Sequence, residues 1–338
     1  MRKLLNTLYI TNEKAYLSLD GENFVCSIED QKDFRIPFDN IEAVVCFSYV
    51  GCSPAVMGKC NEKMVPISFI SPSGKFLTKV TGETKGNVFL RVSQIDKFRQ
   101  ENVSLAQNTV AAKLANSISL IKRSMHDNAV LRSDEAILKA IKSLKAGIDN
   151  VYRANDISSV LGIEGNCAHN YFSVFGKLIK NKSFSFTERN KRPPLDEVNA
   201  VLSLVYTLLV NEYASALETV GLDSCIGFYH TLRSGRPSLA CDLVEEVRCI
   251  AERFVLTLIN LSILNVHDFE KQMSGAVLLN DLGRKKVIGK WQEKKRNVIE
   301  HPVLKQKIQM GLIPYVQANL FSKYLRGEIE EYPCYIVR

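Results

Sequence analysis

The residues best suited to chemistry lie within residues 189–248, where a histidine, several carboxylates and several arginines gather. His230 ends the segment GLDSCIGFYH, and Asp242 and Glu245 follow at a three-residue spacing that places both on one helix face. Upstream, Glu164 in the apolar stretch VLGIEGN could supply another carboxylate. Oxygen ligands suit Mg²⁺, and one imidazole shifts the preference towards Mn²⁺. The pattern indicates a divalent metal site, although a solvated helix face fits the same spacing.

Basic residues surround these candidate ligands. Arg192 precedes a Pro-Pro pair, and Arg233, Arg236 and Arg248 flank the histidine and the carboxylates. Clustered cations beside a metal suit DNA, whose phosphates need neutralising on both sides of a reacting bond. The net charge of +8 favours a polyanionic partner in the same way. A second basic run over residues 284–296 surrounds the single tryptophan, and it could bind a duplex, stack on an unpaired base or form a solvated face.

Two alternative functions remain open from the residues alone. Arg296 and His301 match the pattern R-x4-H, which is typical of a class of metal-independent ribonucleases that use acid–base catalysis on the RNA 2′-hydroxyl. His301 also precedes Pro302, so it could simply mark a helix end. The other alternative is a non-catalytic DNA-binding scaffold with a structural acidic cluster. The chain contains no GxGxxG, GxxxxGK[ST], HExxH or GxSxG motif, so nucleotide hydrolysis and serine hydrolase chemistry have no support.

The elements that must position these residues change character near residue 90. Before that point strand patterns dominate, and AYLSL and NFVCSI around Asp20-Gly21 predict a hairpin. A short helix is expected over Ser53–Asn61, with Ser53 as its N-cap. Further strands are predicted at Phe34–Phe38, Ile41–Phe47, Val65–Ile70 and Phe76–Val80.

From about residue 87 the apolar residues recur at three- and four-residue steps, which is typical of helices. The predicted helices are Leu90–Lys122, Ser133–Asp149, Ser158–Ile179, Asp196–Val220, Ser238–Asn265 and Lys286–Gln309. The sequence therefore predicts an α+β protein. A small N-terminal β-strand domain (1–88) is followed by a larger all-α domain (89–338) that carries the candidate site.

Cysteine use and hydropathy indicate the compartment. The nine cysteines include no CxxC pair, and several sit in apolar runs, as expected of buried thiols in a reducing compartment. The N-terminus lacks the pattern of a secretory signal. The longest apolar stretches, Ala200–Val210 and Phe254–Val266, are too short to span a bilayer. We expect a cytoplasmic protein that does not act in a membrane.

Long, ordered stretches of the chain resemble one known family. RPPLDEVNAVLSLVYTLL, GLDSCIGFYH and SLACDLVEEVR closely resemble the CRISPR-associated spacer-acquisition integrases, the "Cas-one" (Cas1) family. The likeness extends over nearly the whole chain. LLNTLYIT, AYLSLDGEN, IPFDNIEAVVCF and ISFISPSGKF are similar to the version found beside type I-C interference genes, and GNVFLRVSQ resembles the entry into the helical domain.

The resemblance implies roles for individual residues. The metal ligands of the family fall on Glu164, His230 and Glu245, and a further acidic position falls on Asp242 as a supporting or alternative ligand. Tyr229 differs from the family, which has an aliphatic residue before the histidine. The resemblance further implies that Asn199 and Tyr206 support the ligands without binding the metal themselves. Arg192 and Arg248 would contact DNA or support the site, and Arg233 and Arg236 are further candidates for DNA contact.

The resemblance also implies a function. The family consists of Mg²⁺- or Mn²⁺-dependent DNA integrases and endonucleases of CRISPR adaptation. The 3′-hydroxyl of a prespacer fragment attacks phosphodiester bonds of the CRISPR repeat. The implied partners are prespacer and repeat DNA, a second copy of the chain that docks through the β domain, and a small "Cas-two" protein bridging two dimers. In the type I-C setting a "Cas-four" trimming nuclease is a further implied partner.

Overall fold

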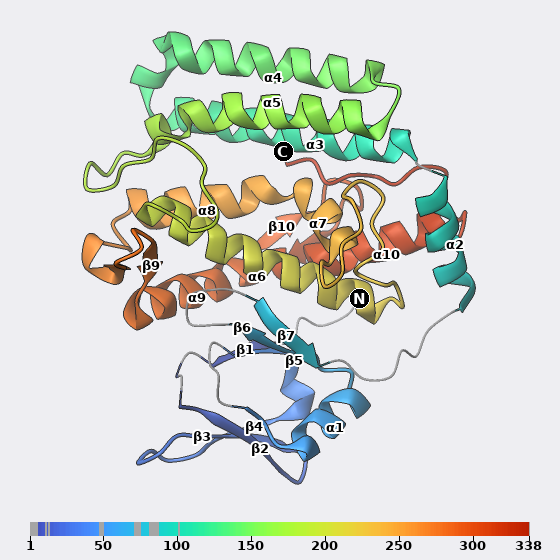
Figure 1. Ribbon diagram of the computed structural model, residues 1–338, viewed down its shortest axis with the longest axis vertical. Helices are drawn as coiled ribbons and strands as arrows, with labels where there is room; N and C mark the ends of the chain where they lie inside the picture. The colour runs from blue at the N-terminus through green and yellow to red at the C-terminus, as the bar shows by residue number, and fades with distance from the viewer. Residues whose placement is uncertain are drawn as a thin grey trace.

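The computed structural model describes residues 6–10, 12, 14–46, 51–70, 76–80, 88–100 and 102–337. The strands of the first eighty residues lie at one end of the molecule, and layers of helices form the rest (Figure 1). One hydrophobic core lies among the strands, between Ile10 and Phe69, and a separate larger core extends from Leu90 to Tyr335. The predicted α+β class is confirmed, while the domain boundary at residue 88 stays a prediction because residues 81–87 lie outside the described part.

Two sheets and one helix make up the N-terminal part. The first sheet has the order β1-β5-β6-β7 and comprises Asn6–Ile10, Ile41–Cys46, Ile67–Ile70 and Phe76–Val80. Its first three strands are parallel, and β7 runs antiparallel to β6. The second sheet is antiparallel in the order β2-β3-β4 and comprises Tyr16–Asp20, Asn23–Ser27 and Phe34–Pro37. Residue Phe47 of the predicted strand Ile41–Phe47 lies outside the described residues.

Two local predictions in this part are confirmed. β2 and β3 form the expected hairpin, and Gly21 in its turn has a φ of +57°, a left-handed conformation that glycine adopts without strain. The short helix α1 (Pro54–Glu62) begins after Ser53, whose hydroxyl accepts a hydrogen bond from Val56 N at 3.3 Å. A serine N-cap followed by proline at the first helical position is a strong helix start, which is why the sequence predicts it well.

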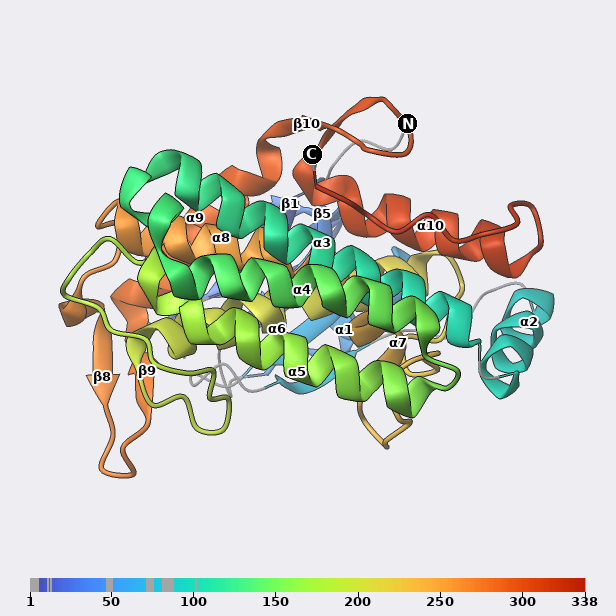
Figure 2. The ribbon, with the colours of Figure 1, turned by 90° about the horizontal axis from the view of Figure 1, so that it is seen from above.

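The helices of the larger part form layers. The first layer comprises α3 (Val103–Asp127), α4 (Glu135–Arg153) and α5 (Ile157–Phe175), seen side by side in Figures 1 and 2. The central helix is α6 (Glu197–Thr219), which packs against α7 (Ser238–Glu245), α8 (Arg248–Asn260) and α10 (Ile313–Leu325). The remaining helices are α2 (Val88–Arg99) and α9 (Asp281–Arg296).

The centre of the helical part is strongly apolar. Within the part of the chain that the structure describes, α6 is the one helix long and apolar enough to cross a membrane. Its most apolar window is 78% buried inside the fold, as expected of a core helix. The hydrophobicity of α6 is therefore accounted for by packing, and the helix holds the elements of the candidate site around it.

The structure corrects three predicted helices. Leu90–Lys122 is divided into α2 and α3, because Asn102 accepts a hydrogen bond from Leu105 N and starts a new helix. Ser238–Asn265 is divided into α7 and α8 at Glu246. Lys286–Gln309 ends as a helix at Arg296, and the hairpin of β10 (Val298–Glu300) and β11 (Lys307–Gln309) follows. A second hairpin, β8 (Phe269–Lys271) with β9 (Val277–Leu279), and helix α10 were not predicted.

The break after α7 coincides with contacts to the end of the chain. The buried carboxylate of Glu246 accepts hydrogen bonds from Tyr332 Oη at 2.5 Å and from Tyr335 N at 2.6 Å. On α3, Asn116 donates to Tyr335 O and accepts from Val337 N, both at 2.8 Å. The C-terminal segment thus passes beside α3 (Figure 1) and is hydrogen-bonded to the residue that follows α7.

Candidate functional site

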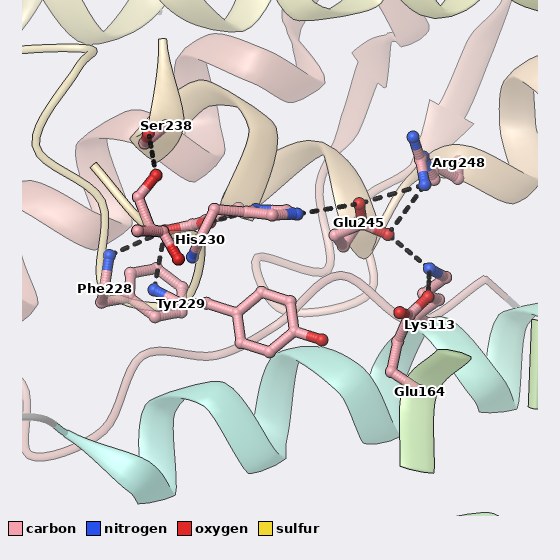
Figure 3. A network of polar contacts seen from close by, with 10 residues as sticks. Lys113, Glu164, Phe228, Tyr229, His230, Ser238, Glu245 and Arg248 are labelled. Carbon is pink, nitrogen blue, oxygen red and sulfur yellow. Dashed lines mark hydrogen bonds and ion pairs between the residues drawn. The ribbon is translucent and has the colours of Figure 1, made fainter. Parts of the chain in front are cut away.

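The three predicted metal ligands come together from three elements of the helical part. Glu164 lies on α5, His230 in the loop before α7, and Glu245 at the last residue of α7 (Figure 3). His230 Nε2 lies 4.0 Å from Glu245 Oε1. Lys113 from α3 joins them, because its ammonium pairs with Glu164 Oε1 and with Glu245 Oε2, the latter at 2.6 Å. The site is thus a carboxylate pair held by one lysine, with an imidazole beside it.

Asp242 fixes the loop that carries His230. Its carboxylate accepts hydrogen bonds from the backbone N–H groups of Phe228 (2.7 Å), Tyr229 (3.0 Å) and His230 (3.0 Å). His230 Nδ1 lies 2.6 Å from the same carboxylate, so the other ring nitrogen, Nε2, faces Glu245. A carboxylate that holds Nδ1–H leaves Nε2 as a free lone pair, the usual arrangement of a metal-binding histidine. Of the two roles predicted for Asp242, the geometry favours support.

The close approach of this loop to α7 depends on Gly227. A Cβ at this position would collide with Asp242 Oδ2 and would lie 2.9 Å from the backbone carbon of Ser238. Any larger residue would therefore push the loop away from the carboxylate that organises it. The glycine of the segment IGFYH is required for the position of His230.

The electrostatic environment keeps Glu245 ionised. Burial alone would raise the pKa of its carboxyl, but Arg248, Lys113 and His230 together lower that pKa to about 2. Arg248 NH1 lies 3.1 Å from Glu245 Oε1. Burial would likewise lower the pKa of Lys113, but Glu245 and Glu164 raise it overall, so the pair is fully charged near neutral pH.

Arg248 connects the site to a buried polar network. Its guanidinium lies 4.7 Å from the ring centroid of Tyr206, and that of Arg189 lies 5.5 Å from the same centroid. Tyr206 Oη donates to Glu252 at 2.7 Å, and Asn199 Oδ1 accepts from Arg189 at 2.6 Å. Tyr206 thus lies against Arg248, the partner of Glu245, while Asn199 binds Arg189 on the other side of the Tyr206 ring. These contacts are those expected of residues that support the site, and the roles predicted for Tyr206, Asn199 and Arg248 stay predictions.

The donor set of the site fits a hard divalent cation. Within the described residues, no three His, Cys, Asp or Glu side chains stand close enough together to hold one ion as they are. The ammonium of Lys113 lies between the two carboxylates, which shows that their potential stabilises positive charge at this place. With that ammonium moved aside, Glu164, Glu245 and His230 Nε2 would offer two carboxylates and one imidazole, a set suited to Mg²⁺ or Mn²⁺.

The remaining predicted DNA contacts lie at the surface. Arg192 is exposed in the segment before α6. Arg233 is exposed and Arg236 half-buried in the loop between His230 and α7. This loop leads directly from a candidate ligand to the surface, so the two arginines could reach phosphates that flank the site.

Trp291 and Lys295 of the second basic run, and His301 of the R-x4-H pattern, have structural roles, while binding of a duplex by the exposed part of the run stays a prediction. Trp291 is buried, and its indole N–H donates to Glu212 at 3.0 Å, while Lys295 pairs with the same carboxylate at 2.9 Å. The idea that this tryptophan stacks on a base is therefore wrong. His301 is fully buried, and its Nδ1 accepts from two backbone N–H groups at 3.3 Å, whereas Arg296 is exposed. A buried imidazole with this partner set cannot reach an RNA 2′-hydroxyl.

Sequence reasoning missed Lys113. It stands in the run VAAKLANS, where Ala111, Ala112 and Leu114 are buried. A lysine set among small apolar residues on a buried helix is a signal that its charge meets a partner inside the fold. The sequence around Lys113 could therefore have indicated a buried ion pair, but it could not have identified Glu164 and Glu245 as the partners.

Tyr229 also points into the site. Its ring packs edge-on against His230, with centroids 5.0 Å apart and an interplanar angle of 67°. The hydroxyl is directed towards the side of the site where Lys113 and Glu164 lie (Figure 3). Burial raises the pKa of the phenol well above its usual value, and Glu164 and Glu245 add to this effect. The phenol is therefore a hydrogen-bond donor at neutral pH.

The fold is shared with solved structures of other proteins. A casposase bound to an integration product superposes with a TM-score of 0.84 at 20% identity, covering 98% of this chain and 94% of that one. A Cas1 protein from Thermotoga maritima gives a TM-score of 0.83 at 21% identity, covering 96% and 97%. At these identities the likeness defines the fold class, a β domain joined to the helical domain of Cas1 proteins and casposases.

The particular family follows from the sequence comparisons. The family described as "CRISPR associated protein Cas1" matches residues 8–293, so the chain belongs to the Cas1 family. CRISPR-associated endonuclease Cas1 1 of Chlorobaculum tepidum is 40% identical, and that of Moorella thermoacetica is 38% identical, each over the full length of both chains. These relatives are named endonucleases of the CRISPR system, and the chain is a nuclease of this family. The narrower type I-C assignment stays a prediction.

Proposed function

We propose that the protein is a metal-dependent DNA integrase and endonuclease that inserts prespacer DNA into a CRISPR repeat. The observation that carries this proposal is the position of His230 Nε2. Asp242 leaves this nitrogen free, and it lies 4.0 Å from Glu245, one of the two carboxylates that pair with Lys113. This is the donor arrangement of a site for a phosphodiester-processing metal ion. Family membership and the casposase fold support the same conclusion.

The residues have distinct parts in this chemistry. When bound, Mg²⁺ or Mn²⁺ would favour the deprotonated 3′-hydroxyl and neutralise charge that develops on the phosphate oxygens. Glu164, Glu245 and His230 would hold the ion, and Asp242 keeps the imidazole in the required tautomer and orientation. Arg248 holds Glu245 in place from the side opposite His230. Hydrolysis would result where a water molecule takes the place of the 3′-hydroxyl.

The DNA and protein partners are proposed from relatives. A solved structure at 21% identity is a Cas6-RT-Cas1–Cas2 complex, and a curated relative from Geobacter sulfurreducens, 33% identical over 98% of this chain, is a Cas4/Cas1 fusion. We propose a Cas2 partner bridging two homodimers and a Cas4 nuclease that trims the prespacer. The homodimer would form through the β domain, and Arg192, Arg233 and Arg236 would contact DNA phosphates. The reaction would take place in the cytoplasm.

Half-site integration of a 3′-hydroxyl fragment into a repeat-bearing plasmid, with the Cas2 partner present, tests the proposal. Glu164→Ala, His230→Ala and Glu245→Ala are each expected to abolish strand transfer, and EDTA should do the same. Glu270→Ala and His126→Ala are matched controls, because both side chains are exposed and distant in sequence from the site. Full activity in all three site variants would refute the assignment.

The two alternatives give different results in the same preparation. A metal-independent ribonuclease would cleave RNA in EDTA and would lose that activity on His301→Ala. A non-catalytic scaffold would bind duplex DNA without strand transfer in Mg²⁺ or Mn²⁺. The burial of His301 disfavours the first, and the paired carboxylates with a free imidazole nitrogen disfavour the second.

A further inference from the structure

The Tyr229 hydroxyl is a buried donor that lacks an acceptor. The residue is 3% exposed, and among the described residues no group forms a hydrogen bond with its Oη. Buried polar groups are nearly always hydrogen-bonded, because a donor that has lost water and found no partner costs free energy of folding. Such a group, placed in a candidate site, indicates that a ligand supplies the missing acceptor.

The position of this hydroxyl is fixed by its surroundings. The backbone N–H of Tyr229 is held by Asp242 Oδ2 at 3.0 Å, and the ring packs against His230. Gly227 allows the loop that carries Tyr229 to lie directly against α7. The hydroxyl therefore stays directed into the site, as Figure 3 shows.

The acceptor is not one of the two carboxylates. Glu164 is engaged by Lys113, and Glu245 by Lys113 and Arg248, and neither bonds to the phenol. The proposed reaction brings a phosphodiester to this site, and its anionic oxygens are strong hydrogen-bond acceptors.

We propose that the Tyr229 hydroxyl donates a hydrogen bond to a non-bridging oxygen of the DNA phosphate that undergoes attack. This inference rests on the proposed function and adds Tyr229 to the residues that contact the substrate. Negative charge develops on this oxygen in the transition state of strand transfer. A donor that already points at it lowers the activation free energy, because the donor does not have to reorient during the reaction.

Tyr229→Phe removes the hydroxyl and keeps the ring. The matched control is Tyr213→Phe on α6, whose hydroxyl is also buried without a hydrogen-bond partner in the described part of the chain. Three quantities are measured for each protein: the melting temperature in EDTA, the rate of half-site integration, and the affinity in Ca²⁺ for a branched DNA that mimics the half-integrated product, relative to an unbranched duplex of the same length.

Tyr229→Phe is expected to melt no lower than the wild-type protein, because it loses only an unsatisfied group. It should nevertheless integrate about tenfold more slowly and lose about tenfold of the preference for branched DNA, as expected when one hydrogen bond to a charged oxygen is removed. Tyr213→Phe should match the wild type in both activity and preference. Unchanged rate and preference in Tyr229→Phe would overturn the inference, and so would a clear loss of stability in EDTA. An inactive wild-type protein would instead overturn the proposed function.

Discussion

Replacing Lys113 with methionine should make the stability of the protein depend on metal. The substitution keeps most of the buried volume of the side chain, which is 11% exposed, but removes the charge between Glu164 and Glu245. Removing one partner of a buried ion pair costs about 3–5 kcal/mol. Here Arg248 still pairs with Glu245 at 3.1 Å, and Glu164 is partly solvated, so we expect about 2–3 kcal/mol.

A loss of this size should be visible by thermal unfolding in EDTA. At about 2 °C per kcal/mol for a chain of this length, the apparent Tm of Lys113→Met should fall by roughly 4–6 °C. Mn²⁺ at a hundred times its Kd stabilises a folded protein by about 2.7 kcal/mol. In the wild-type protein, part of this gain in stability is lost, because the ion displaces the Lys113 ammonium from Glu164 and Glu245. The rise in Tm on adding Mn²⁺ should therefore be larger in the variant.

Lys177→Met is the control for this experiment. Lys177 pairs with Asp134 at 2.7 Å, but its side chain is 44% exposed, so its removal should change the Tm by no more than about 1 °C with or without metal. The reasoning is refuted if Lys113→Met melts like the wild type in EDTA. An equal rise in both proteins on adding Mn²⁺ would show that the ion and the ammonium do not compete for one place.

Three further results are expected. Burial, with Arg253 nearby, lowers the pKa of Lys294 to about 8. Between pH 8 and 10.5 the unfolded chain therefore binds more protons at this lysine than the folded protein does, so the stability of the fold rises with pH. Below pH 8 the buried charge of Lys294 destabilises the folded protein. Lys294→Met should then raise the free energy of unfolding at pH 7 by up to about 3 kcal/mol, with a corresponding rise in Tm. The gain over the wild type should vanish as the pH approaches 10.5, and the control Lys290→Met, whose side chain is 43% exposed, should show no such trend. Asp242→Asn should weaken Mn²⁺ binding by roughly 10–100-fold in calorimetry, because the amide cannot hold both His230 Nδ1–H and the backbone donors equally well; unchanged affinity would contradict its supporting role. His301→Ala should lower the unfolding free energy in urea without changing integration, and a selective loss of RNA cleavage would restore the ribonuclease hypothesis.

The strands β2 to β7 and the start of α1 could be predicted because their signals are local. The Asp20-Gly21 turn and the Ser53 cap each depend on neighbours within a few residues. The break between α7 and α8 could not be predicted, since the partners of Glu246 lie near residues 332–335. The local pattern of residues 238–265 is helical throughout, and a distant contact interrupts it.

The residues of the candidate site also fall into some that the sequence could identify and some that it could not. Spacing placed Asp242 and Glu245 on one helix, but it could not distinguish a supporting carboxylate from a ligand, because that depends on how the loop of His230 folds over α7. Resemblance to a family supplied Glu164. Neither residue spacing nor the family resemblance pointed to Lys113. Its partners Glu164 and Glu245 come from α5 and α7, and they approach each other only in the folded chain.

The hydrogen bonds of the C-terminal segment also bear on when the protein can fold during its synthesis. Glu246, next to the proposed ligand Glu245, accepts a hydrogen bond from Tyr335, and Asn116 accepts one from Val337. About 90 residues must be translated after Glu246 before these bonds can form, which takes roughly 5 to 20 seconds at ordinary rates of synthesis. Ribosome-bound chains therefore lack the final support of α7. The candidate site therefore gains this support from α7 only after residues 332–337 have been synthesised and have left the ribosome.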